Sequence, residues 1–131
     1  MKIADVIQGA DWKVEKHAPV IEAPEKVKAG ESFTVDLCVG KEIAHPNTTE
    51  HHIRWIKLYF KADNGKFVYE IGSFEFNVHG ESVDGANKGP VYTDPVAKAV
   101  VKLSSSGTLL ATSYCNIHGL WENSQTIIVE A

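Results

Sequence analysis

The stretch "ESFTVDLCVG", residues 31–40, decides the fold class because its side chains alternate between apolar and polar. A spacing of two is typical of a β-strand that buries one face and exposes the other. Cys38 falls on the face opposite the apolar residues, so we expect it to be a free structural thiol. The apolar set consists of Phe33, Val35, Leu37 and Val39.

Further strands are predicted along the rest of the chain. Residues 53–62 and 66–78 are rich in aromatic and β-branched residues and are separated by the turn signal "DNG", which predicts a hairpin. Residues 97–103 and 107–115 flank "SSSG" and predict a second hairpin. Residues 124–130 supply a last strand.

Two segments lack the strand pattern. Residues 1–10, "MKIADVIQGA", place Ile3, Val6 and Ile7 at helical spacing and predict a short helix. Residues 79–95 contain too many Gly, Asn, Asp and Pro residues for a regular element and predict a long surface loop.

The length and composition of the chain predict a single domain over residues 1–131. With 131 residues, of which 44% are hydrophobic, the chain can bury one core but is too short for two ordinary domains. Six or seven short strands with hairpin links predict an all-β protein. We expect an immunoglobulin-like antiparallel β-sandwich of about seven strands with a short N-terminal helix.

Charge and cysteine content exclude several classes of protein. The formal net charge is -4 and there is no basic run, so nucleic acid and anionic membranes are not expected partners. No segment approaches the roughly 20 apolar residues of a membrane span, and the N-terminus lacks the apolar stretch of a signal peptide. Two cysteines allow one disulfide at most, which favours a reducing compartment. We expect a cytoplasmic protein.

Histidines gather in the predicted loops and at strand ends. "EKHAPVIEAP" holds His17, and "GKEIAHPNTTEHHIRW" holds His45, His51 and His52. "SYCNIHGLWE", residues 113–122, places Cys115 three positions before His118. A lone C-x-x-H is more often structural than functional. The loops of a β-sandwich meet at its ends, however, so these segments can converge on one metal ion.

The ligand types leave several metals open. A tetrahedral zinc site needs four ligands, such as two thiolates and two imidazoles. A blue-copper centre uses two imidazoles, one thiolate and usually an axial methionine, but the only methionine is Met1. Four imidazoles with one thiolate suit an iron ion with an open sixth position. A copper electron-transfer protein is the second candidate, and a β-sandwich protein that binds a partner without catalysis is the third.

Four separated blocks of the sequence resemble superoxide reductase of the one-iron neelaredoxin type, from the desulfoferrodoxin iron-binding domain family. The blocks are "EKHAPVIE", "GKEIAHPNTTEHHIRW", "HGES" and "SYCNIHGLWEN", and the resemblance runs over nearly the whole chain. The chain departs from the family at Ala44, where proline is usual, and it lacks the cysteine-rich N-terminal module of desulfoferrodoxins.

The resemblance implies a mononuclear non-haem iron with an axial thiolate. By family pattern His118 binds through its δ nitrogen and the other histidines through their ε nitrogens. The choice of His51 over its neighbour His52 rests on the resemblance alone, and His52 and His79 are expected to be supporting or surface groups. The implied ligands are His17, His45, His51 and His118 in the equatorial plane and Cys115 on the axis.

The activity implied by the resemblance is the one-electron reduction of superoxide to hydrogen peroxide, with electrons from a donor such as reduced rubredoxin. The family assigns Lys16 the role of attracting superoxide. Glu15 resembles the carboxylate that closes onto the oxidised iron. A homo-oligomer is expected, with the tetramer favoured, and a copper electron-transfer protein remains the alternative.

Overall fold

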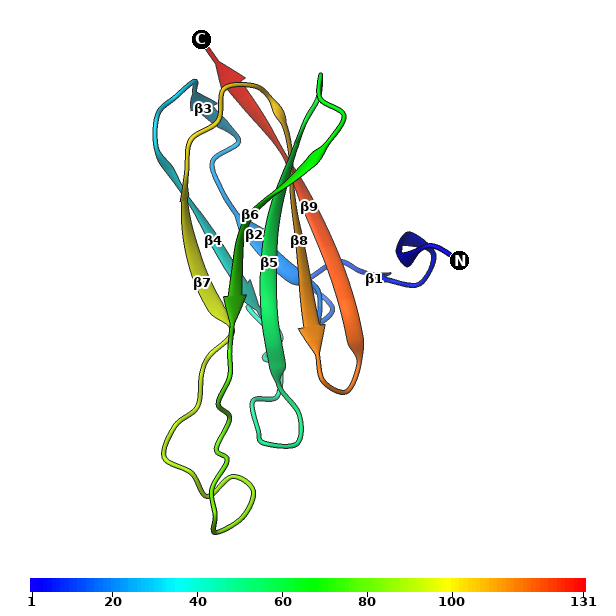
Figure 1. The fold of residues 1–131 in the computed structure, drawn as a ribbon, viewed down its shortest axis with the longest axis vertical. Coiled ribbons are helices and arrows are strands. Elements are labelled where there is room, and N and C mark those ends of the chain that lie inside the picture. The colour runs from blue at the N-terminus through cyan, green and yellow to red at the C-terminus, as the bar shows by residue number, and fades with distance from the viewer.

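The computed structural model describes residues 1–131 and consists almost entirely of strands and loops (Figure 1). One turn of 3-10 helix, η1 (Ile3–Asp5), precedes the strands. The nine strands are β1 (Gln8–Gly9), β2 (Pro19–Glu22), β3 (Lys26–Lys28), β4 (Phe33–Val39), β5 (Ile53–Ala62), β6 (Val68–Glu75), β7 (Val96–Val101), β8 (Gly107–Cys115) and β9 (Gly119–Glu130).

The strands form two sheets that pack as a β-sandwich. The larger sheet has the order β1-β9-β8-β5-β6, with β3 also paired to β9, and the smaller sheet has the order β2-β4-β7. The long strands pair antiparallel, whereas the short strands β1 and β3 run parallel to β9. The prediction of an all-β fold is therefore confirmed. The strand count is nine instead of about seven.

The core lies between the two sheets and follows the alternation seen in residues 31–40. Val35 and Leu37 of β4 are almost completely buried, as are Ile56 and Leu58 of β5 and Leu109 of β8. Apolar burial of this kind is the main favourable contribution to folding. Cys38, between Leu37 and Val39, is only partly buried and forms no disulfide, as predicted.

The predicted N-terminal helix is wrong beyond its first turn. Only Ile3–Asp5 is helical, and the side chains of Ile3 and Val6 are 67% and 53% exposed. The apolar stripe on residues 1–10 has no surface to pack against, and a helix of ten residues is not stable alone. Instead, Gln8 and Gly9 pair with Trp121 and Glu122 of β9.

The predicted hairpin between residues 97–103 and 107–115 is also wrong. β7 pairs with β4 in the smaller sheet, while β8 pairs with β5 and β9 in the larger one. The turn at residues 104–106 thus crosses between the sheets. The predicted hairpin of β5 and β6 is confirmed. The unpredicted β2 begins with a proline, which fits its position at the edge of the smaller sheet.

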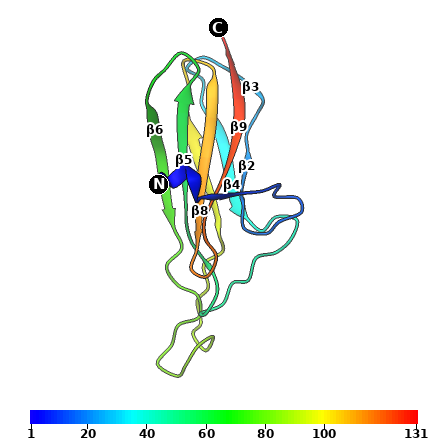
Figure 2. The same ribbon diagram turned by 90° about the vertical axis from the view of Figure 1, so that its right-hand side faces the viewer.

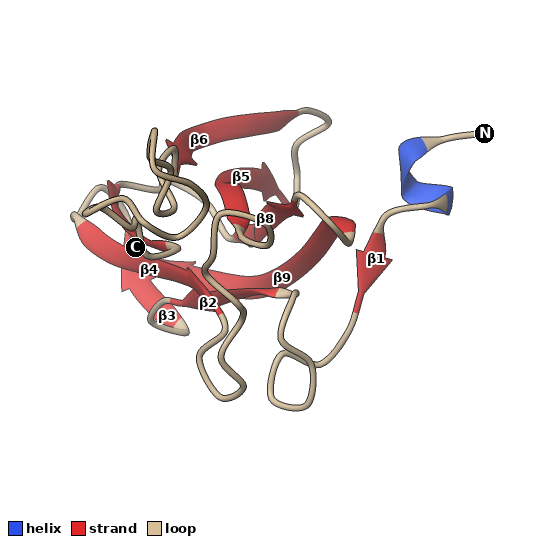
Figure 3. Ribbon diagram, turned by 90° about the horizontal axis from the view of Figure 1, so that it is seen from below, coloured by secondary structure: helices blue, strands red, loops and turns tan.

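The strand directions bring several connections to one end of the sandwich. β2, β5 and β9 begin there and β4 and β8 end there, because Pro19 pairs with Val39 and Cys115 with both Ile53 and Gly119. This is the lower end in Figures 1 and 2, opposite the C-terminus, and it faces the viewer in Figure 3.

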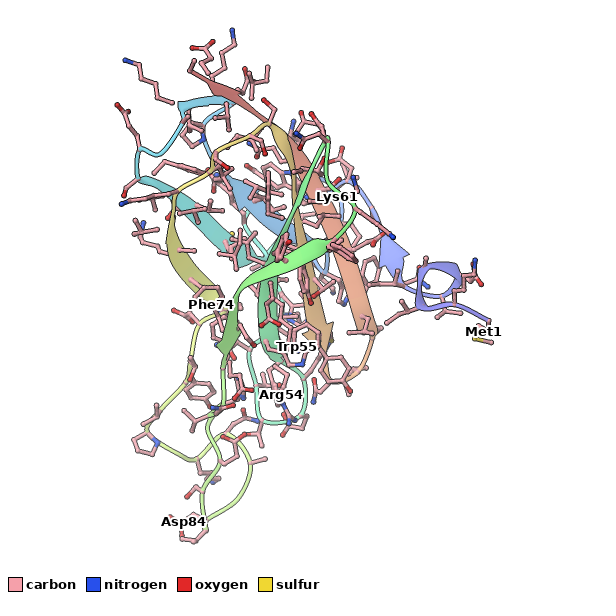
Figure 4. All side chains as sticks on the ribbon, turned by 45° about the horizontal axis from the view of Figure 1, so that its top comes forward. Met1, Arg54, Trp55, Lys61, Phe74 and Asp84 are labelled. Carbon is pink, nitrogen blue, oxygen red and sulfur yellow. The ribbon has the colours of Figure 1, made fainter.

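The longest connection, between β6 and β7, leaves the same end of the sandwich. It has no strand, as predicted, and only one isolated bridge joins His79 to Tyr92. Asp84 marks its tip in Figure 4, well beyond Arg54 at the beginning of β5. The structure has no helix with the length and apolar character that crossing a membrane requires.

Candidate metal centre

Side chains from three distant segments meet at the loop end of the sandwich. One potential ligand atom from each of His17, His45, His51 and Cys115 lies within 4.8 Å of every other. His17 comes just before β2, His45 and His51 lie in the connection from β4 to β5, and Cys115 is the last residue of β8. The predicted convergence of these loops is therefore present.

His118, in the turn between β8 and β9, adds a further nitrogen to this cluster. Its Nδ1 lies 3.1 Å from Nε2 of His17, 3.3 Å from Nε2 of His51 and 3.8 Å from Sγ of Cys115. A metal bonded to imidazole nitrogens at about 2.1 Å holds adjacent nitrogens about 3 Å apart. The spacing and the mixture of imidazole and thiol donors fit one transition-metal ion, with the δ nitrogen of His118 facing the ε nitrogens of its neighbours.

Glu15 fixes the orientation of His17. Its carboxylate accepts the backbone N–H groups of His17 at 2.6 Å and Ala18 at 2.9 Å, and its other oxygen contacts Nδ1 of the His17 ring. A proton on Nδ1 leaves Nε2 free to bind a metal. Burial alone would raise the pKa of Glu15, but its hydrogen bonds with His17 and Ala18 lower the pKa below its ordinary value.

The rings of His45 and His51 are in the neutral form that a metal ligand requires. Nδ1 of His45 donates to the carbonyl of Pro46 at 2.7 Å, and its Nε2 is buried without a hydrogen-bond partner. Burial lowers the pKa of His45 to about 4, so the ring is neutral near pH 7. Burial, followed by the charges of His118 and His17, also lowers the pKa of His51. An orphaned buried nitrogen on a neutral ring is the state a metal ligand needs.

Cys115 is completely buried, and its sulfur has one backbone donor. The N–H of His118 lies 3.3 Å from Sγ, which is a contact that tunes how strongly a thiolate donates to a metal. The N–H of Asn116 points elsewhere and donates to the carbonyl of His52 at 3.2 Å.

Two further side chains border the cluster. The ring of Trp121 stacks on His17 with 4.9 Å between centroids, and its Nε1 donates to the carbonyl of His118 at 3.2 Å. Lys16 is partly buried, and its charge contributes, after burial and the neighbouring histidines, to the lowered pKa values of His45 and His51. Lys16 directly precedes His17 in the chain, and the role expected for it stays a prediction.

His52 and His79 stand outside the cluster and form a pair of their own. Both are buried, and their rings stack with 3.6 Å between centroids and 5° between planes. Nδ1 of His52 donates to the carbonyl of Thr48 at 2.9 Å, whereas Nε2 of His79 has no partner. Nothing in the sequence pointed to this pair, because 26 residues of loop and strand separate the two histidines.

Comparison with known proteins places this arrangement in a family. The family model described as desulfoferrodoxin matches residues 9–124. Neelaredoxin of Megalodesulfovibrio gigas is 55% identical over 130 residues, covering 99% of this chain and 100% of its own. Superoxide reductase of Pyrococcus furiosus is 55% identical over 125 residues, covering 95% of this chain and 98% of its own.

Solved structures agree in fold as well as in sequence. A crystal structure from Thermotoga maritima is 62% identical, has a TM-score of 0.97 and covers 100% of this chain and 99% of its own. The family match spans the segments that carry the histidines and the thiol of the cluster. The chain therefore belongs to the desulfoferrodoxin family.

Proposed function

We propose that the protein is a superoxide reductase with one non-haem iron per chain. The observation that carries this proposal is the meeting of imidazole nitrogens and one buried thiol at the loop end of the sandwich. The related proteins named neelaredoxin and superoxide reductase support it. The proposed ligands are His17, His45, His51, His118 and Cys115.

The proposed reaction adds one electron and two protons to superoxide and forms hydrogen peroxide. No dioxygen is produced. The bound iron would supply the electron by passing from the ferrous to the ferric state. The fold supplies a donor set in which one thiol lies among imidazoles, and as a thiolate ligand this sulfur would increase the electron density on the bound metal.

Residues around the ligands have separate roles in this proposal. The backbone N–H of His118 adjusts electron donation by the Cys115 sulfur, and Lys16 draws the superoxide anion toward the cluster. Glu15 holds His17 in the tautomer that leaves its Nε2 free. A second role for Glu15, as the carboxylate that closes onto the oxidised centre, requires it to exchange its contacts with His17 for a new partner.

The donor, assembly and location of the protein are also proposals. By family resemblance, electrons come from a reduced rubredoxin-like protein in the cytoplasm. Association with further copies of the chain is supported by the exposed apolar side chains of Met1, Ile3, Val6 and Val14, and the family resemblance favours a homotetramer. Light scattering on the purified protein measures the number of subunits.

The antiparallel pairing of the long strands supports an immunoglobulin-like type of sandwich.

Metal content and product stoichiometry test the proposed function together. We expect one iron per chain and one hydrogen peroxide for each superoxide consumed when a reductant is present. A dismutase would form one peroxide and one dioxygen from two superoxide ions. Copper in place of iron would favour the electron-transfer alternative, and dioxygen release at the dismutase ratio would contradict the proposal.

A further inference from the structure

The side chain of Asn116 brackets His51 with two hydrogen bonds. Its Nδ2 donates to the carbonyl of Glu50 at 2.9 Å, and its Oδ1 accepts the N–H of His52 at 2.9 Å. The Glu50 carbonyl belongs to the peptide group before His51, and the His52 N–H belongs to the peptide group after it. One amide therefore holds both peptide groups that flank a ligand of the proposed iron.

The backbone of Asn116 adds a third contact to the same segment. Its N–H donates to the carbonyl of His52 at 3.2 Å, so one residue makes three hydrogen bonds to the two neighbours of His51. Asn116 directly follows Cys115 in the chain, while Glu50 and His52 lie 66 and 64 residues earlier. The contacts thus join the segment of the thiol to the segment of His51.

The bracketed turn has little freedom of its own. The N–H of Thr48 donates to the carbonyl of His51 at 2.9 Å, and the N–H of His51 donates to Oγ1 of Thr48 at 3.1 Å. On its other side, Oδ1 of Asn87 accepts the N–H of Thr49 at 2.9 Å. The turn is therefore closed internally, and its placement depends on contacts from outside it.

We propose that Asn116 is a positioning residue that sets His51 relative to Cys115. The inference rests on the proposed function only in treating these two residues as ligands of one metal. His52 is buried and its hydrogen bond with Asn116 is partly buried, so loss of Oδ1 would leave the His52 N–H without its protein acceptor. A buried unpaired donor is costly, and the turn would shift to relieve it. Residues that orient metal ligands typically change metal affinity by about 10- to 100-fold when they are replaced.

The test compares three full-length variants in the metal-free and cobalt-loaded states. Asn116→Ala removes both side-chain contacts, and Asn116→Asp retains the acceptor for the His52 N–H. Gln125→Ala is the matched control, because its amide joins β9 to the carbonyl of Ala23 at 3.0 Å, away from the cluster. Hydrogen exchange reports the His52 amide in the metal-free protein, and titration with Co²⁺ reports affinity through the thiolate absorption.

We expect Asn116→Ala to speed exchange of the His52 amide at least about tenfold and to weaken Co²⁺ binding by about tenfold or more. Asn116→Asp should keep the His52 amide protected, and Gln125→Ala should retain wild-type values in both measurements. Wild-type exchange and affinity in Asn116→Ala would overturn the proposal. If the wild-type protein fails to reduce superoxide but Co²⁺ binding still depends on Asn116, the proposed function falls and the positioning role stands.

Discussion

At the scale of single residues, Cys115 and Cys38 each have a thiol group, but the surroundings of the two thiols differ. Cys115 is completely buried beside His118, whereas Cys38 lies on the outer side of β4. Burial raises the pKa of Cys38, with a further increase from the charge of Glu22, so this thiol is held in its protonated form. Only Cys115 has neighbours suited to a thiolate that binds a metal.

Replacement of Cys115 by serine should therefore abolish the sulfur-to-iron absorption band of the oxidised protein. We expect superoxide reduction to fall by more than about 100-fold, which exceeds the usual effect of losing a residue that only supports a ligand. Absorption spectroscopy and pulse radiolysis measure the two effects. Cys38→Ser is the control and should keep both properties. Bleaching in Cys38→Ser alone would show that Cys38, and not Cys115, is the sulfur ligand.

The lowered pKa of His45 predicts a pH dependence for the metal-free protein. Its pKa is about 4 in the folded state, against about 6.5 in an unfolded chain. Between these values the unfolded state binds the proton and the folded state does not, so stability falls as the pH decreases from about 6.5 to about 4. Urea unfolding of the metal-free protein at several pH values measures this loss.

His45→Ala is the matched variant for that experiment. Its stability should vary less with pH across the same window, because the titrating ring is gone. An equal slope in wild type and variant would show that another group causes the dependence. His51, whose pKa is also lowered by burial, contributes in the same direction and remains in both proteins.

Residue chemistry in the sequence predicted a metal site, and the choice of His51 over His52 came from the family resemblance, but neither predicted the supporting contacts. Imidazoles and a thiol in loops indicate a metal site because few other uses require that combination. The bond between Glu15 and the His17 ring depends on how the chain bends before β2, and the stacking of His52 on His79 depends on tertiary packing. Neither contact has a signature in residue type or spacing.

At the scale of elements, the hairpin of β8 and β9 carries two of the proposed ligands on one tight turn. Cys115 pairs with Gly119 across the hairpin, which leaves residues 116–118 as the turn. Gly119 has a φ of 79°, in the left-handed region that glycine adopts readily. A Cβ at this position would meet no atom within 4 Å, so only the backbone conformation opposes substitution.

Gly119→Ala should destabilise the protein by about 1 kcal/mol through this backbone strain, equivalent to a melting temperature about 4 °C lower. The substitution should also shift the absorption spectrum of the metal-loaded protein, because the strained residue ends the turn that follows Cys115. Calorimetry and absorption spectroscopy measure these effects. Gly30→Ala is a close control, since Gly30 has a φ of 77° and equal space around it. Equal spectral shifts in the two variants would contradict a local effect.

Elements with a strong local pattern were predicted well, and those fixed by distant contacts were not. The strands at residues 53–62 and 107–115 match β5 and β8 because their composition and turn signals are clear. β2 was missed because its residues 19–22 begin with Pro19, closely precede Pro24 and become a strand only by pairing with β4. The partner of β7 was mistaken because a short polar turn can either close a hairpin or cross between sheets.

At the scale of the whole molecule, an anionic substrate must approach a protein with a formal net charge of -4. Attraction therefore depends on where the cations lie. Lys41 has its Nζ 2.7 Å from Oε2 of Glu22, so much of its field is cancelled. Lys16, beside the cluster, has no such ion pair.

Lys16→Ala should slow the reaction of the reduced protein with superoxide by about fourfold at low ionic strength. Two unit charges about 5 Å apart in water interact by about 0.8 kcal/mol, and salt screens this attraction. Pulse radiolysis across ionic strength should therefore show a weaker salt dependence in the variant. Lys41→Ala should retain the wild-type rate and slope. A wild-type salt slope in Lys16→Ala would remove Lys16 from the steering role.

The distance along the chain between the clustered side chains has a consequence for folding. His17 and His118 are 101 residues apart, and the protein has no disulfide. An ion held by both would cross-link the entry to β2 in one sheet with the β8–β9 turn in the other. Such a link restricts the unfolded chain and couples binding to folding. Metal insertion would thus be a late step of folding that cross-links the two sheets. Removal of the metal by a chelator would destabilise the loop end of the sandwich before the end that carries the C-terminus.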